Sequence, residues 1–241
     1  MGDNNAIMTP AWEETYDEAQ RKTEDTRRKM FIDSIREKIP AVDPDLAFLT
    51  PEEILQAMKS NPVILEYFER IENYEAPEKE LALLYPDADR KPWTKGKTDA
   101  LIYRNLHTAI KNLKLEDRIT IFTISPLLGV VPMEWYDDIP MYDASGSQSF
   151  MVRRRGLSWD QDKFREVIQR SAEILDAFLA KNHERMGTWH IVYRDPSVHK
   201  RIFETAMDIQ PRAIWPHKTR KSLADSYLAI RNIMKEIVET L

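Results

Sequence analysis

The chain contains no cysteine, and this absence excludes a large part of protein chemistry. Disulfide bonds, thiolate nucleophiles and cysteine-ligated zinc or iron–sulfur clusters are all ruled out. No stretch approaches about 18 consecutive apolar residues, and the N-terminus lacks a basic patch followed by an apolar core. We therefore expect a soluble, cytoplasmic protein with no membrane partner. Any chemistry must come from Lys, Asp, Glu, Ser, Tyr or His side chains.

Two further absences narrow the possible chemistry. The five histidines show no H-E-x-x-H arrangement or equivalent metal spacing, and no serine lies in a G-x-S-x-G elbow. We therefore predict no metal and no cofactor, and we interpret each histidine as an ordinary side chain. The histidines are His107, His183, His190, His199 and His217.

Length and charge indicate one α/β domain with an added segment. The 241 residues are enough for a core that needs no covalent cross-link. The net charge of −5 argues against a surface that is uniformly attractive to nucleic acid, although two local basic patches remain. These patches are Arg90, Lys91, Lys95 and Lys97, and the triplet Arg153, Arg154 and Arg155. Each is either a solvated loop or a contact for a polyanion.

Hydrophobic periodicity divides the chain into a helical first part and an alternating remainder. The helical patterns cover residues 10–38, 50–60 and 61–74, with Thr50 and Asn61 placed as caps. Four strand-like runs then alternate with amphipathic stretches: strands at 80–86, 119–125, 188–193 and 213–215, and helices at 98–114, 163–180, 197–207 and from 222. We predict an α/β domain over residues 61–241, with a mostly parallel central sheet flanked by helices, and an N-terminal helical extension over residues 1–60.

The loop after the first predicted strand is the most unusual short stretch of the sequence. Residues 88–99 read ADRKPWTKGKTD, with four cations, a proline and a tryptophan. Ligands of parallel sheets bind at the carboxyl ends of strands. A helix start capped by Thr98, together with Lys95 and Lys97, would form an anion site there. The single glycine disfavours a nucleotide triphosphatase, whereas a lysine nucleophile or base and a plain solvated turn both stay open.

The loop after the second predicted strand is long, apolar and acidic. It reads SPLLGVVPMEWYDDIPMYDASG from Ser125. Glu134 or Asp143 could hydrogen-bond the edge of a guanine-like base, and Tyr142 or Trp135 could stack on it. Alternatively, the loop folds into the core through its leucines, valines and Trp135. Because both loops follow strands of one parallel sheet, they are predicted to open on the same edge.

The two loops together resemble the lyase-like domain of archaeosine synthase and of related archaeal tRNA-guanine transglycosylase paralogues. The first loop, PDADRKPWTKGKTD, matches the family at its Pro, Lys-Pro and Lys-x-Lys-Thr positions, with Trp93 in place of a tyrosine. The second, ISPLLGVVPMEWYDDIPMYDASG, is similar to a Ser-Pro-Leu-Gly-hydrophobic-Val-Pro-x-Glu turn with one extra leucine. The likeness covers roughly residues 60–207. This chain departs from the pattern where the family cysteine, serine and histidine are Asp87, Gly96 and Asp99.

The resemblance implies a protein of 7-deazaguanine modification that binds or modifies a 7-cyano-7-deazaguanine nucleotide in tRNA or another nucleic acid. It implies catalytic roles for Lys91, Lys95, Lys97, Asp87 and Asp99, and substrate binding by Trp93, Thr98, Ser125, Gly129, Glu134, Tyr142 and Asp143. Nucleic-acid contact would come from Arg153, Arg154 and Arg155, with a protein partner supplying further RNA binding. Two alternatives stay open: a noncatalytic subunit that binds nucleic acid or a partner, and a base-releasing enzyme similar to a glycosidase.

Overall fold

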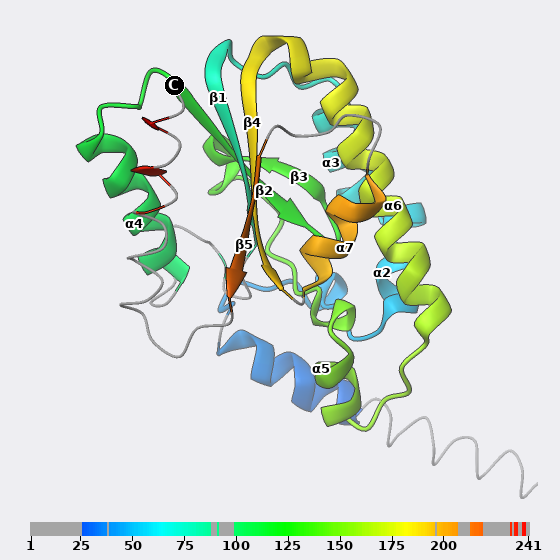
Figure 1. The fold of residues 1–241 in the computed structure, drawn as a ribbon. Helices are drawn as coiled ribbons and strands as arrows, with labels where there is room; N and C mark the ends of the chain where they lie inside the picture. The colour runs from blue at the N-terminus through cyan, green and yellow to red at the C-terminus, as the bar shows by residue number, and fades with distance from the viewer. Residues whose placement is uncertain are drawn as a thin grey trace, which may run out of the picture.

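A five-stranded sheet forms the centre of the molecule (Figure 1). The computed structural model describes residues 26–37, 39–87, 91, 99–195, 197–206 and 213–218, and positions 232, 234, 235, 238 and 239. The strands are β1 (Lys79–Pro86), β2 (Ile119–Ser125), β3 (Gly129–Pro132), β4 (Met186–Asp195) and β5 (Ala213–Lys218), in the order β3-β2-β1-β4-β5. All neighbouring pairs are parallel except β2 and β3. The predicted class, a mostly parallel α/β fold, is confirmed.

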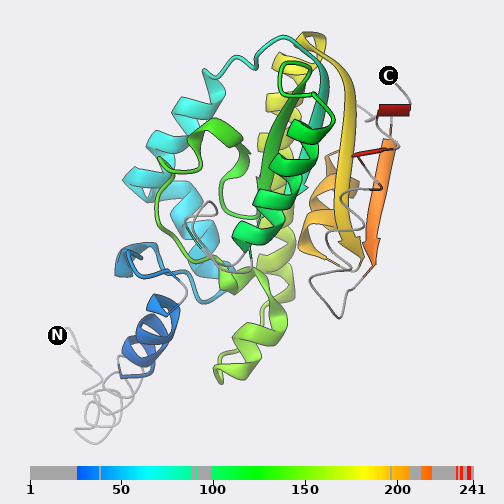
Figure 2. The same ribbon diagram turned by 90° about the vertical axis from the view of Figure 1, so that its left-hand side faces the viewer.

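Helices cover both faces of the sheet. On one face lies α4 (Asp99–Asn112), in front of the sheet in Figure 2. The helices of the other face are α2 (Pro51–Ser60), α3 (Pro62–Glu72), α6 (Gln161–Asn182) and α7 (Val198–Thr205). Alternation along β1 supplies both layers, since Leu81 and Leu83 pack with α4 while Ala82 and Leu84 pack with α6 and α7.

Helix starts follow the capping signals of the sequence. The Thr50 hydroxyl accepts a hydrogen bond from the Glu53 backbone N–H at 3.2 Å, and the Asn61 side chain accepts from the N–H of Val63 at 3.0 Å. The predicted caps of α2 and α3 are therefore confirmed. Buried side chains of α2 belong to the same core as the sheet, so this helix packs on the α/β layers. The division of the chain near residue 60 stays a prediction.

Other described elements are short. They are η1 (Pro44–Leu46), η2 (Met133–Trp135), η3 (Ser145–Ser147), α5 (Ser149–Arg154) and η4 (His183–Arg185), and residues 26–36 are also helical. The predicted helix at 10–38 is thus described only from residue 26, and most of the predicted helix from 222 lies outside the described residues. In the described part of the chain, every helix is too short or too polar to cross a lipid bilayer.

Strand β3 differs from the sequence prediction, which treated residues 126–146 as one loop. It pairs antiparallel with β2 from Gly129 opposite Ser125 to Pro132 opposite Phe122. The hairpin is possible because Gly129 has a φ of +70°, a backbone angle that favours glycine. Four residues are too few for alternation to reveal a strand, so the sequence pattern missed it.

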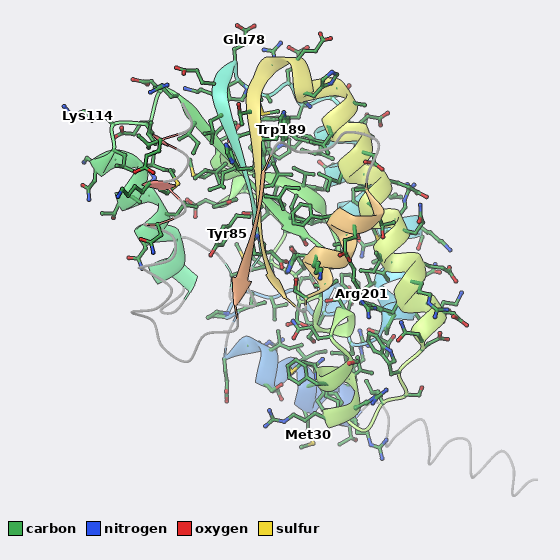
Figure 3. All side chains as sticks on the ribbon, in the orientation of Figure 1. Met30, Glu78, Tyr85, Lys114, Trp189 and Arg201 are labelled. Atoms are coloured by element: carbon green, nitrogen blue, oxygen red, sulfur yellow. The ribbon has the colours of Figure 1, made fainter. Side chains whose placement is uncertain are left out.

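The strand order creates a switch point between β1 and β4. From β1 the chain passes through α4 on one face to β2, and from β4 it passes through α7 on the other face to β5. Connections that leave two adjacent strands in opposite directions open a crevice at their carboxyl ends. In Figure 3, Glu78 marks the start of β1, Tyr85 lies near the other end of this strand, and Arg201 marks α7.

Candidate functional site at the carboxyl edge of the sheet

Asp87 and His199 form a close pair at this switch point. Asp87 directly follows β1, and its backbone N–H donates to the Ile124 carbonyl of β2 at 2.9 Å. This bond extends the parallel ladder by one residue. It thereby fixes the backbone position from which the Asp87 side chain extends. Asp87 Oδ1 lies 2.8 Å from His199 Nε2, and the side chains are 14% and 12% exposed. The pair is therefore largely shielded from bulk water yet close to the surface.

The position of His199 is set by the packing of α7. The Ser197 hydroxyl caps this helix by accepting from the Lys200 backbone N–H at 3.1 Å. Ile202 and Phe203, three and four residues after the histidine, are buried in the core. Residues three and four apart share one face of a helix, so the packed face of α7 is also the face that carries the imidazole.

Tyr142 links the second loop to the pair. Its side chain is fully buried, its hydroxyl lies 2.6 Å from Ser125 Oγ, and it donates a long hydrogen bond of 3.4 Å to Asp87 Oδ2. Backbone N–H groups of Leu127 and Leu128 donate to Ser125 Oγ at 3.3 Å each. The end of β2, the loop behind it and the residue after β1 therefore share one hydrogen-bonded cluster.

Lys91 contributes a cation to the same cluster. It is 5% exposed, and its Nζ lies 3.9 Å from the centroid of the Tyr142 ring. An ammonium over an aromatic face is attracted to the ring's negative π-surface. Lysine is rarely buried unless its charge is compensated. We define Asp87, Lys91, Ser125, Tyr142 and His199 as the edge cluster.

Electrostatics keep the phenol of Tyr142 protonated. Burial, followed by the negative charge of Asp87, raises the pKa of Tyr142 well above its ordinary value. The phenol therefore remains a donor toward the carboxylate. Since a hydroxyl carries one proton, the Ser125 hydroxyl must then be the donor in its bond to Tyr142.

Other residues predicted for the site lie elsewhere. Glu134 accepts a short hydrogen bond from Tyr74, beside Trp135, over which the Arg70 guanidinium lies at 3.8 Å. This placement follows from β3, which runs antiparallel to β2 and carries the chain back from the carboxyl edge. The structure therefore does not bring Glu134 into the edge cluster.

Gly129 and Asp143 have local structural contacts. A Cβ on Gly129 would lie 2.4 Å from the Ile174 side chain of α6, so this turn tolerates only glycine. Asp143 Oδ1 accepts from the Ser145 backbone N–H at 2.9 Å, and the Asp143 carbonyl accepts from the Phe48 N–H at 2.8 Å. Both residues shape the loop that carries Tyr142.

The arginine triplet is split by its environment. Arg153 and Arg154 are exposed in the last turn of α5. Arg155 is half-buried, donates to the Ser145 hydroxyl and lies 5.5 Å from the centre of the Phe31 ring. Burial lowers the pKa of Arg155 from its ordinary value, against the opposing effect of nearby carboxylates. Two of the three arginines therefore face solvent.

The remaining predicted residues are not described. Trp93, Lys95, Lys97 and Thr98 lie outside the described residues, and Asp99 is described only as the first residue of α4. Among the described ranges, no group of three or more His, Asp or Glu side chains could hold a metal ion.

His199 was missed by the sequence analysis. The histidines were compared only with the spacings of metal ligands. Such spacings give no information about a histidine that pairs with a carboxylate. A usable signal existed, because the rule that directed attention to loops after the first two strands applies equally after the strand at 188–193. His199 opens the helix behind that strand.

Comparison with known proteins leaves the family open. No protein-family model and no curated protein matches the chain. The chain is similar to the crystal structure of AF0587, a protein of unknown function, with 20% sequence identity and a TM-score of 0.43. The similarity covers 71% of this chain and 49% of that one, so the chain spans about half the length of that protein.

Proposed function

We propose that the edge cluster is part of a site that binds, and modifies, a nucleotide carrying 7-cyano-7-deazaguanine in tRNA or another nucleic acid. The observation that supports this is the contact between the two motifs on which the family resemblance rests. Asp87 and Lys91 of the first motif both contact Tyr142 of the second, whose hydroxyl also bonds to Ser125. Two motifs that match one family in order, and that touch in space, are most simply parts of one site.

The chemistry proposed here differs from thiolate attack. The family cysteine is replaced by Asp87, whose oxygens face His199 and the Tyr142 hydroxyl. A carboxylate held in this way accepts hydrogen bonds and stabilises positive charge on a neighbouring ring. The reaction would therefore depend on acid–base groups, with a nucleophile supplied by a lysine side chain or by a second substrate.

Contact with the polynucleotide would use the exposed arginines of α5. Arg153 and Arg154 face solvent, and phosphate contacts by such side chains supply sequence-independent affinity. With a net charge of −5, the chain would hold a polyanion weakly by itself. A protein partner that adds RNA-binding surface is part of the proposal.

A binding comparison tests the proposed ligand. Fluorescence anisotropy would measure the affinity for one tRNA with 7-cyano-7-deazaguanine and for the same tRNA with guanine. We expect tighter binding of the modified tRNA, and loss of that preference in a Lys95→Ala/Lys97→Ala variant. The control is Lys111→Ala/Lys181→Ala, which removes the same charge near the ends of α4 and α6. Equal affinity of the unmodified chain for both tRNAs would overturn the proposal.

Mass spectrometry of the tRNA nucleosides after incubation, with and without free lysine, separates the alternatives. An altered deazaguanine supports a modifying enzyme. Selective binding with an unchanged base favours the noncatalytic subunit. Release of the free base favours the glycosidase-like enzyme, in which Asp87 or Asp99 would act on the glycosidic bond.

A further inference from the structure

We propose that His199, positioned by Asp87, is the proton-transfer residue of the edge cluster. The choice of substrate rests on the function proposed above, whereas the assignment of the pair rests on hydrogen-bond geometry alone. Asp87 is accordingly a positioning residue that acts through the histidine.

The hydrogen bonds of the cluster have one consistent direction. An ionised carboxylate only accepts, so the 2.8 Å contact between Asp87 and His199 requires a proton on Nε2. Tyr142 donates to the other carboxylate oxygen, and the Ser125 hydroxyl donates to Tyr142. In this series of hydrogen bonds, every donor therefore points toward Asp87.

This direction fixes the tautomer of the neutral histidine. With Nε2 protonated and bound to Asp87, the basic lone pair lies on Nδ1. Such an arrangement, in which a carboxylate holds one ring nitrogen so that the other can exchange a proton, is the general form of a histidine base. Nδ1 is therefore the atom that would face a substrate.

The proposed step moves a single proton. Nδ1 takes the proton from an N–H or O–H group of the attacking substrate, whose electron pair then forms the new bond to the nitrile carbon of the deazaguanine. One C≡N π-electron pair moves onto the nitrile nitrogen as this bond forms. The positive charge on the imidazolium is balanced by Asp87. Nδ1 then gives the proton to the nitrile nitrogen, which restores the neutral ring.

The location of the pair favours this role over a purely structural one. Asp87 and His199 are 112 residues apart and lie just after β1 and in the helix after β4, the two strands that flank the switch point. Lys91 adds a buried lysine beside the ring that donates to Asp87. A carboxylate, an imidazole and an ammonium gathered at one edge of the sheet match the composition of catalytic sites.

The first test reads the tautomer without any substrate. Long-range proton–nitrogen NMR spectra of the labelled full chain distinguish a protonated from an unprotonated ring nitrogen, and His199→Asn assigns the signal. We expect Nε2–H for His199 in the neutral ring, and a changed tautomer ratio in Asp87→Asn. The matched control Asp162→Asn, on an 83% exposed carboxylate of α6, should leave the signal unchanged. The assignment would be overturned if Asp87→Asn left the tautomer ratio of His199 unchanged. It would also be overturned if the neutral ring carried its proton on Nδ1 in the wild-type protein.

The second test separates catalysis from binding. On tRNA with 7-cyano-7-deazaguanine, His199→Asn should lower turnover by at least about 100-fold, the usual effect of a general base. Affinity for the tRNA should stay within about twofold, and exposed His183→Asn should match the unmodified chain. Turnover by His199→Asn at the original rate would refute the proton-transfer role.

The two proposals fail in different ways. If the unmodified chain neither selects nor alters the deazaguanine tRNA, the proposed function is wrong, and the NMR result still decides whether Asp87 positions His199. If His199→Asn loses its fold by circular dichroism, Asp87→Asn serves for both readouts, because it keeps the shape of the side chain and removes the charge.

Discussion

His190 and His199, nine residues apart in the chain, occupy opposite kinds of environment. His190 is 2% exposed in the middle of β4, where its register partner on β1 is Leu83, so it faces the apolar layer beneath α4. Burial lowers the pKa of His190 to about 4. His199 lies beyond the same strand, against the carboxylate of Asp87. Burial in an apolar layer disfavours the charged form of a histidine, whereas a neighbouring carboxylate gives the ring a hydrogen-bond acceptor.

The topology explains why the two rings differ. Positions inside a central strand of a parallel sheet face packed helices on both sides, so polar partners are scarce there. Positions just past the carboxyl end meet loops from neighbouring strands, and these loops supply Asp87 and Tyr142. The same residue type is therefore part of the core at one position and a candidate for chemistry a few residues later.

The largest expected effect is the pH dependence caused by His190. Its folded pKa lies below the unfolded value, so the unfolded state binds the extra proton as the pH falls from about 6.5 to about 4. The free energy of unfolding should drop across this window by up to about 3 kcal/mol from this group. Urea titrations at several pH values should show a smaller drop in His190→Leu, and exposed His107→Gln should behave as the unmodified chain. Parallel pH profiles of His190→Leu and the unmodified chain would contradict this prediction.

A smaller effect is expected from Tyr142→Phe, which tests the surroundings of His199. The substitution leaves Asp87 Oδ2 and the Ser125 hydroxyl without their common partner, and such a loss in a buried site costs about 1–3 kcal/mol. Chemical denaturation would measure it, and NMR should show a shifted His199 ring with an unchanged His190 ring.

The matched control is Tyr74→Phe. Tyr74 also donates to a carboxylate, that of Glu134, but this bond is exposed. Its loss should cost less than about 1 kcal/mol, as for other exposed polar pairs. Equal destabilisation by the two tyrosine substitutions would show that the edge cluster has no special dependence on its buried hydroxyl.

The smallest effect is expected in the arginine triplet, where neighbouring residues again differ by environment. Arg155→Ala removes a half-buried guanidinium from Ser145 and Phe31, and should cost about 1 kcal/mol in thermal unfolding. Arg153→Ala should stay within about 0.5 kcal/mol, because this side chain is exposed. If Arg153→Ala were more destabilising than Arg155→Ala, the burial of these two side chains would differ from that in the structure.

Much of the fold follows from local sequence signals. The four parallel strands and the caps at Thr50 and Asn61 were predicted because burial on both faces and helix starts both leave short-range patterns. Strand β3 was missed because its four residues form part of a hairpin set by one glycine, and such a strand is specified by pairing with β2 and not by its own alternation.

The site was less accessible to sequence reasoning. Asp87, Lys91, Ser125 and Tyr142 could be selected because they lie in two recognisable loops, and the structure brings them together. Glu134 lies in the same loop as Tyr142 but is turned toward Tyr74, since the direction of β3 decides where each residue of that loop faces. Predicting His199 as a site residue would have required knowing which strand lies beside β1. Local sequence patterns do not specify the order of strands in a sheet.

The separation of 112 residues between Asp87 and His199 has a consequence for synthesis. A ribosome-bound chain that has released β1, α4 and β2 already holds the carboxylate, but the imidazole arrives only after α6 and β4 have folded against them. The contact between Asp87 and His199 would therefore form late in synthesis, once α7 has been made and has packed against the sheet.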